Sequence, residues 1–347
     1  MVWVRRHPGL VAAFGFVSGV LSFTLIERHE GVGRVMAIAM LAGWLLLVLE
    51  RVLSQAVATR FGHAPPPALL RYLTQFTHQE SLFFALPFFA ASTSWNSGQA
   101  LFSIAVAAAA LVAIIDPIYY RRLATRRWLF LGYHTFALFA LLLVALPLIL
   151  RLPAMASYQL ALGIAVLLSF PTLAGLITLP RWWRPLLVLL LLAGLGAAGW
   201  FARLWVPPAT LRLTEVAVTT AFDTVGRSPE LALQRIGAAQ LREHGLYAYT
   251  AIHAPLGLSE RVRHVWLHEG REVDSIELEV KGGRAEGYRA WTRKLNFPER
   301  PEGRWQGRDW SSDVCSSDLD HAIVRWQVRV LTADDRMIGT LRFQVDP

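Results

Sequence analysis

Four ionisable side chains lie within or beside long apolar runs in the N-terminal half of this sequence. They are His78 and Glu80 in a His-Gln-Glu triplet, Asp116 directly before a proline, and His134 directly after a tyrosine. Neutral imidazole and carboxylate groups pass protons and bind divalent metals, and ionisable groups at bilayer depth are rare and usually partnered. We therefore predict a candidate intramembrane polar site. The alternative is structural, with His78 and Glu80 solvated in the headgroup layer and Asp116 capping a helix end.

An aromatic and basic run in the C-terminal half contains Tyr288, Arg289, Trp291 and Arg293. Such side chains can stack on and pair with an anionic glycan or peptide, which makes the run a candidate ligand-binding strand. The same run alternates between two sets of side chains, as a strand with two different faces does. We favour this second interpretation.

The sequence offers little equipment for metal binding or catalysis. His264 and His268 would share one face of a strand, as two zinc ligands do, but no obvious third ligand lies nearby, so we expect exposed or hydrogen-bonded histidines. Cys315 is the single thiol, which excludes a disulfide framework and a multi-thiolate site. No HExxH, Walker, GxGxxG or GxSxG pattern occurs. We predict no catalytic residue, no metal and no cofactor, and favour a protein that is not an enzyme.

The chain divides into two halves that differ in charge. Residues 1–205 hold fifteen Arg, no Lys and five acidic residues, a net charge of +10 (15 − 5). Residues 206–347 hold nineteen basic and twenty acidic residues, a net charge of −1 (19 − 20). The positive charge therefore flanks apolar runs, and a nucleic-acid partner is not supported. With 54% hydrophobic and 17% charged residues, the chain is neither disordered nor a plain soluble enzyme.

Residues 1–205 contain several runs that are long enough to cross a bilayer, which takes about 20 apolar residues per helix. Seven such runs occur at 9–26, 35–53, 79–95, 100–119, 128–150, 157–178 and 186–204. The third run contains Pro87, and a re-entrant or kinked segment is the alternative there. We predict an α-helical polytopic membrane domain of about seven spans.

The distribution of arginine predicts how these spans are oriented. Eleven Arg residues fall in the connections on one side and four in those on the other. Because cytoplasmic loops are rich in Lys and Arg, the N-terminus is predicted to be cytoplasmic and, with seven spans, the C-terminal domain extracytoplasmic. We expect a multi-pass protein of the bacterial inner (plasma) membrane, with the lipid bilayer as partner. The sequence leaves the oligomeric state open.

Residues 206–347 show the period-two alternation that is typical of strands. We expect a helix that opens at Ser228 and closes at Gly245. Seven strands are expected at 211–222, 246–253, 262–268, 273–280, 287–294, 326–332 and 338–345. About seven short strands predict a soluble, all-β immunoglobulin-like sandwich, here without the hallmark Cys pair.

Several short motifs link the sequence to known families. Those of the tail are His264-Val-Trp266, Tyr288 to Lys294, Gly303-Arg-Trp305, and Trp326-Gln-Val328-Arg-Val330 with Gly339 and Phe343. On these, the tail resembles a bacterial domain of unknown function, family twenty-nine-fourteen. The N-terminal half, with His78-Gln79-Glu80 and Asp116-Pro117-Ile118-Tyr119, is similar to the multi-span domain that commonly precedes it. The resemblance covers nearly the whole chain and implies no activity and no catalytic residue.

One stretch, 307–327, departs from the pattern of the family. Within it, residues 311–319 read SSDVCSSDL, and the last five back-translate to DNA that looks like a sequencing-library adapter. The flanks also agree, because Arg-Trp-Gln at 304–306 recurs at 325–327. Long structureless loops are unusual in compact domains. We interpret 307–327, with Cys315, as an artefactual insertion rather than a Ser/Asp-rich hairpin loop.

Three functions from different classes fit these features. The favoured one is an envelope protein whose extracytoplasmic (periplasmic) β-sandwich binds a protein or an envelope polymer such as a glycan. The alternative is a proton- or metal-coupled transporter that uses the four polar residues of the N-terminal half, and convergence of these residues in one place would favour it. A membrane enzyme that modifies lipid or glycan is the least favoured.

Overall fold

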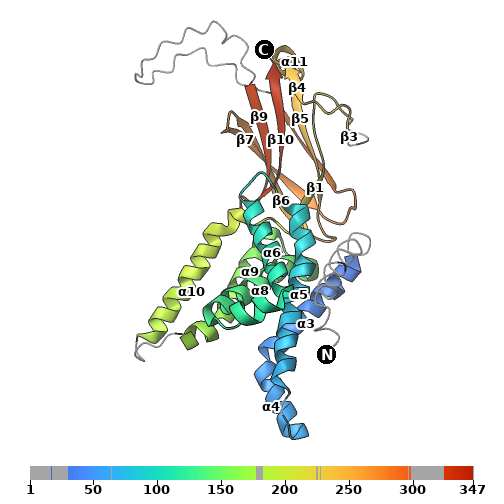
Figure 1. The fold of residues 1–347 in the computed structure, drawn as a ribbon. Coiled ribbons are helices and arrows are strands. Elements are labelled where there is room, and N and C mark those ends of the chain that lie inside the picture. The colour runs from blue at the N-terminus through green and yellow to red at the C-terminus, as the bar shows by residue number, and fades with distance from the viewer. Residues whose placement is uncertain are drawn as a thin grey trace.

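The computed structural model describes residues 17, 30–63, 65–176, 183–223, 226, 228–295, 297 and 324–346. We call residues 30–205 the helical region and residues 212–346 the β region, because the uninterrupted series of helices ends at Trp205 and the first strand begins at Arg212. Figure 1 shows the β region standing on one end of the helical region.

The helical region is built around two long helices, α5 and α8, that share one apolar core. Leu82 and Phe89 of α5, Val106 of α6, and Leu141 and Val144 of α8 are all completely buried there. The helices are α3 (Glu30–Val48), α4 (Glu50–Phe61), α5 (Pro67–Ser92), α6 (Gln99–Ile114), α7 (Asp116–Ile118), the π-helical turn η1 (Tyr119–Leu123), α8 (Arg127–Leu150), α9 (Ala154–Leu176), α10 (Arg184–Phe201) and the 3-10 turn η2 (Ala202–Trp205). α10 lies at one side of the region, packed against α9 (Figure 1).

Three helices of the described residues are long and apolar enough to cross a membrane: Gly31–Val48, Arg127–Leu150 and Pro185–Trp205. A fourth span results if α6 and the segment from Asp116 to Leu123, which meet at a bend of 92°, are counted as one. The expectation of about seven spans is therefore not confirmed. Of the run at 9–26 only residue 17 is described. The run at 79–95 falls mostly on α5, whose first half carries polar residues such as Arg71, Gln75 and His78.

The strands of the β region form two main sheets. β1 (Arg212–Thr219), β5 (Leu246–His253) and β8 (Tyr288–Lys294) make a three-stranded antiparallel sheet in that order. The five-stranded sheet has the order β4 (Arg235–Gly237), β10 (Met337–Asp346), β9 (Val324–Thr332), β6 (Ser259–His268) and β7 (Arg271–Lys281), with β4 and β10 parallel. β2 (Phe222–Asp223) and β3 (Ser228–Pro229) pair with each other.

One hydrophobic core lies between the two sheets. Val218 and Ile252 of the smaller sheet and Val262, Trp266 and Val328 of the larger one belong to the same buried cluster. Because alternate residues of a strand point to one face, the period-two patterns of the sequence become the inner faces of the sheets. All seven expected strands are confirmed within a few residues. The immunoglobulin-like type is not established by this arrangement.

The expected helix at 228–245 is correct only at its end. Residues 228–229 belong to β3 and 235–237 to β4, and the helix α11 spans only Ala238–His244. Gly245 follows it with a φ of 69°, a left-handed value that favours glycine after a helix. The error has a long-range cause, since Arg235 and Ile236 pair with Gln344 and Val345 at the far end of the chain.

The structure describes only part of the segment 307–327, which we interpreted as an artefactual insertion. Residues 307–323 lie outside the described residues, whereas 324–327 form the first part of β9. Trp326 is 3% exposed and packs its ring parallel to that of Phe343. Deleting 307–327 would require Trp305 to replace Trp326 in this register, and the artefact stays a prediction.

Candidate functional site: a buried histidine chain

Three hydrogen-bonded side chains form a continuous chain in the core of the helical region. Tyr119 Oη lies 2.8 Å from His78 Nδ1, and His78 Nε2 lies 2.9 Å from His134 Nδ1. His78 is completely buried, Tyr119 is buried, and His134 is half-buried. We call Tyr119, His78 and His134 the histidine chain.

A break between α6 and α7 brings Tyr119 to this position. Pro117 has no N–H with which to bond the carbonyl of Ala113, four residues earlier, and its ring would collide with that carbonyl in a continuous helix. The polypeptide bends by 92° here, and the side chain of Gln75 on α5 donates its Nε2 to the free Ala113 oxygen at 2.9 Å. A side chain of α5, the helix that also carries His78, thus supplies the hydrogen bond that the carbonyl oxygen at the bend would otherwise lack.

A second polar network lies beside the histidine chain. Gln75 Nε2 also donates to Asp116 Oδ1 at 2.8 Å, and Gln75 Oε1 accepts a hydrogen bond from Tyr120 Oη at 2.5 Å. Gln75 precedes His78 by three residues, a spacing that places both on one face of α5. Asp116 therefore contacts the face of α5 that carries His78, but none of these hydrogen bonds connects Asp116 to His78 itself.

Aromatic side chains enclose the two imidazoles. Trp44 of α3 lies with its ring centroid 4.6 Å from that of His134 and 5.4 Å from that of His78, and its Nε1 donates to Ser81 Oγ at 2.8 Å. Tyr133 of α8 meets His78 edge to face at 5.2 Å. These rings keep His78 away from bulk solvent, whereas His134 stays half-buried.

The structure brings some of the four expected site residues together and separates another. His78 and His134 touch, and Asp116 joins the neighbouring network through Gln75. Glu80 is half-buried and lies two residues after His78, a step of about 200° around a helix, so it leaves α5 on a different face. The alternative in which His78 is solvated by headgroups is wrong, since its ring is fully buried.

Sequence reasoning missed three members of this arrangement. Gln75, Tyr119 and Tyr120 carry no charge at neutral pH, so a search for ionisable groups in apolar runs passes over them. The only local signal is the helical spacing of Gln75 and His78. Within the described residues no group of three or more His, Cys, Asp or Glu could hold a metal ion.

The histidine chain has the chemistry of a proton relay. Each neutral imidazole has one N–H donor and one nitrogen acceptor, and a phenol both donates and accepts. If Tyr119 donates to His78 Nδ1, then His78 Nε2 donates to His134 Nδ1, and His134 carries its own proton on Nε2. When a proton enters at the Tyr119 hydroxyl, Tyr119 can therefore pass its own proton to His78 Nδ1. His78 then passes its Nε2 proton to His134 Nδ1, and His134 releases its Nε2 proton.

The predicted ligand-binding strand, β8, has the two faces that we favoured. Ala290 is buried, whereas Arg289 and Arg293 leave from the other face. Arg289 donates to the Gly226 carbonyl at 3.0 Å, and Arg293 lies 5.0 Å from the ring centroid of Tyr247.

The remaining two residues of this strand also contact the β region itself. Trp291 packs against Phe222 of β2 with ring centroids 4.7 Å apart. Tyr288 is half-buried and packs against the core between the sheets. A ligand-binding role for the strand stays a prediction.

His264 is a buried histidine of the hydrogen-bonded kind that we expected. Its Nε2 lies 3.0 Å from Thr250 Oγ1 and its Nδ1 lies 3.1 Å from Thr292 Oγ1, so this β6 residue bridges to both β5 and β8. The ring is completely buried, and this burial lowers the pKa of His264 from 6.5 to about 4. The side chain is therefore neutral at physiological pH.

Two family models match the chain. The Family of unknown function (DUF5924) matches residues 1–248, and the Protein of unknown function (DUF2914) family matches residues 259–307. The second match confirms the resemblance of the tail, and it ends where the interpreted insertion begins. The first match continues past the helices through β1 into β5, so its boundary does not coincide with the change from helices to strands. The chain matches no curated protein and no solved structure.

Proposed function

This chain belongs to the Family of unknown function (DUF5924), and from its geometry we propose that it is a multi-pass protein that passes protons across a membrane along the histidine chain. The carrying observation is the unbroken set of hydrogen bonds from Tyr119 through His78 to His134. The proposal keeps the expected orientation in the bacterial inner membrane, with the Arg-rich connections in the cytoplasm and the β region outside. It corresponds to the proton-coupled form of the transporter alternative given above, and it does not invoke a metal.

The surface of the helical region supports a membrane location. Leu189 and Leu190 of α10 are 64% and 59% exposed, and only 6% of the span Pro185–Trp205 is buried by the rest of the protein. Soluble proteins rarely expose so much contiguous apolar surface, and where they do it marks a membrane or protein interface. The length of the span Pro185–Trp205 matches the thickness of a bilayer core.

The composition of the core supports a functional rather than a purely structural chain. Placing polar groups in an apolar core costs free energy unless every group is hydrogen-bonded. Leu or Phe would fill the same space without that requirement. His78 and His134 instead lie side by side, with the Asp116 carboxylate near the Tyr119 end of the chain and the half-buried His134 at the other end. This order of groups is the one that a relay needs.

Proton flux in vesicles tests the proposal. The full chain is reconstituted into liposomes that contain a pH-sensitive dye, and a potassium gradient with valinomycin drives protons inward. His78→Gln can hydrogen-bond but cannot relay, so we expect its flux to fall about tenfold or more, toward that of protein-free vesicles. His63→Gln replaces an exposed histidine and is the matched control.

A second variant separates loss of relay from loss of folding. Tyr119→Phe removes only the hydroxyl at one end of the chain and should also lower the flux, while its helicity and elution volume stay those of the unsubstituted protein. Flux from the unsubstituted protein equal to that of empty vesicles, or full flux from a folded His78→Gln variant, would contradict the proposal.

A second proposal concerns the β region, which would bind an envelope glycan or protein outside the cytoplasm through the outer face of β8. The supporting observation is that Trp291 is partly open to solvent beside the exposed Arg293. Trp291→Ala should lower retention of the full chain on an anionic cell-wall glycan about tenfold, the loss of one aromatic contact. Trp128→Ala, at an exposed site of α8, is the control. Equal retention of both variants would exclude this face.

A further inference from the structure

Two hollows of different character meet at one residue, Gln159 of α9. The first is an apolar groove of about 390 Å³ between α9 and α10, which we call the α9–α10 groove. The second is a pocket of about 670 Å³ that is lined by both apolar and charged residues, between the start of α9 and strands β6 and β7, and we call it the junction pocket. Gln159 lines both, so the two hollows adjoin.

The groove exists because small residues face it. A Cβ added to Gly163 on α9 or to Gly196 on α10 would meet no atom within 4 Å. One turn away the helices touch, since a Cβ at Gly199 would collide with Leu162. The helices therefore pack closely at one point and leave an open apolar channel beside it, walled by Val166.

The end of the groove near the β region carries the side chains that favour a membrane surface. Trp200 lines the groove there, and the guanidinium of Arg203 lies 4.6 Å from its ring centroid. Trp is enriched at the level of lipid headgroups, and an Arg near the end of a membrane helix extends its charged group to the same level. On the membrane placement proposed above, Gly163 and Gly196 then lie at the depth of acyl chains.

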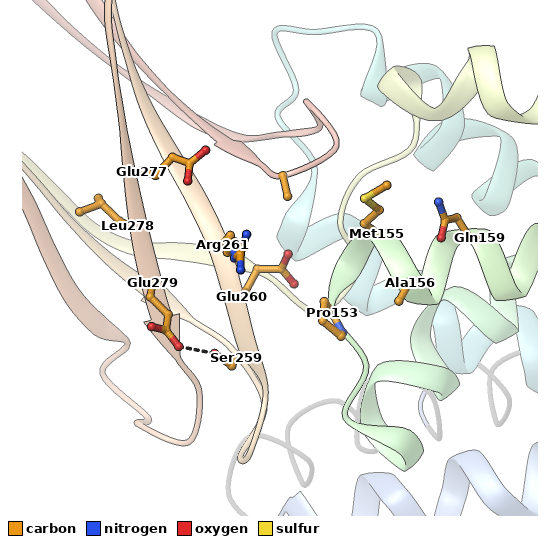
Figure 2. Close-up of a pocket in the computed structure, with 11 residues that line it drawn as sticks. Pro153, Met155, Ala156, Gln159, Ser259, Glu260, Arg261, Glu277, Leu278 and Glu279 are labelled. Atoms are coloured by element: carbon orange, nitrogen blue, oxygen red, sulfur yellow. Dashed lines mark hydrogen bonds between the residues drawn. The ribbon is translucent and has the colours of Figure 1, made fainter.

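The junction pocket has the charge to select a headgroup. Figure 2 shows Glu260 and Glu277 on its strand side and Met155 and Gln159 on its helix side. Three carboxylates line it (Glu260, Glu277 and Glu279) against the single cation Arg261. Glu260 and Glu279 have partners, the Ala154 N–H at 2.6 Å and the Ser259 hydroxyl at 2.9 Å. Such a lining suits an ammonium group, with Arg261 able to pair with a phosphate.

We propose that the α9–α10 groove and the junction pocket together bind one phospholipid with an amine-bearing headgroup. An acyl chain occupies the groove, the phosphate lies near Arg261, and the ammonium group lies near Glu277. The lipid then contacts both the helical region and the β region. The inference rests on the membrane placement and is independent of the histidine chain.

Native mass spectrometry of the full chain released from detergent tests this site. The probes are dioleoyl phosphatidylethanolamine and dioleoyl phosphatidylglycerol, which differ in the amine. We expect one retained lipid, with the ethanolamine headgroup preferred. Gly196→Leu fills the groove and should lower retention about tenfold or more. Gly194→Leu is the matched control, because Gly194 lies on the same helix, has equal space for a side chain and does not line the groove.

The headgroup is tested separately. Glu277→Gln should abolish the preference for ethanolamine over glycerol, whereas Glu272→Gln, on the same strand outside the pocket, should keep it. Retention by Gly196→Leu equal to that of the unsubstituted protein, or a preference for phosphatidylglycerol, would overturn the site. His78→Gln should retain the lipid normally, so failure of the proton relay and failure of the lipid site give different results.

Discussion

Replacing Arg336 with Met is expected to lower the free energy of unfolding of the β region by about 3–5 kcal/mol. Arg336 and Asp334 have side chains that are 2% and 1% exposed, and Arg336 Nε donates to Asp334 Oδ2 at 2.8 Å. Removing the cation leaves a carboxylate buried without its partner, close to the equally buried Glu260. The cost comes from this uncompensated charge and not from the attraction of the pair itself.

The comparison that isolates this cost uses the full chain in detergent, with urea unfolding followed by pulse proteolysis. Arg342→Met, on the exposed face of β10, is the control and should change the stability by less than about 0.5 kcal/mol. The double variant Arg336→Met with Asp334→Asn should recover much of the loss, because no bare charge remains. Equal stability of the Arg336→Met and Arg342→Met variants would show that Asp334 tolerates the loss of its cation, and would contradict this prediction.

For a Glu260→Gln variant, we expect the free energy of unfolding to increase by roughly 3 kcal/mol as the pH rises from 4 to 6.5. The cause is His264, which is buried in its neutral form. Burial lowers the pKa of His264 from 6.5 to about 4, so over this interval the unfolded chain binds more protons than the folded one. The contribution of His264 is therefore complete above pH 6.5 and is lost as the pH falls toward 4.

Glu260 acts in the opposite direction in the unsubstituted protein. Burial raises the pKa of Glu260 from 4.5 to about 7, so its contribution is complete below pH 4.5 and is lost as the pH rises through 7. The two effects offset each other between pH 4.5 and 6.5, and we expect a flatter profile for the unsubstituted protein than for Glu260→Gln. Gln keeps an acceptor for the Ala154 N–H, so the comparison isolates the charge.

The measurement is the urea midpoint of the full chain as a function of pH. His244→Gln, at an exposed histidine, is the matched control and should leave both profiles unchanged. Superimposable profiles of the unsubstituted protein and the Glu260→Gln variant between pH 4.5 and 6.5 would contradict the assignment of these two groups.

Local periodicity decided how much of the β region the sequence could predict. The strand around Ile276, Leu278 and Val280 was visible because alternate side chains of a strand share one face, and β7 spans Arg271–Lys281 around it. Residues 228–237 carried helix signals at Ser228 and Pro229, but pairing with β2 and β10 prevailed. Propensity is a weak preference that partners distant in the chain can override.

By itself, the sequence determined that this protein has an apolar helical half with polar residues at His78, Asp116 and His134, followed by a β-rich half. Composition and periodicity are local properties, because the contribution of each residue to them does not depend on its tertiary contacts. Only the tertiary structure decided that His78 meets His134, 56 positions away, and that Gln75 joins α5 to the bend at Pro117. Those contacts depend on how α5, α6 and α8 pack, because side chains meet only where helices distant in the sequence share a core.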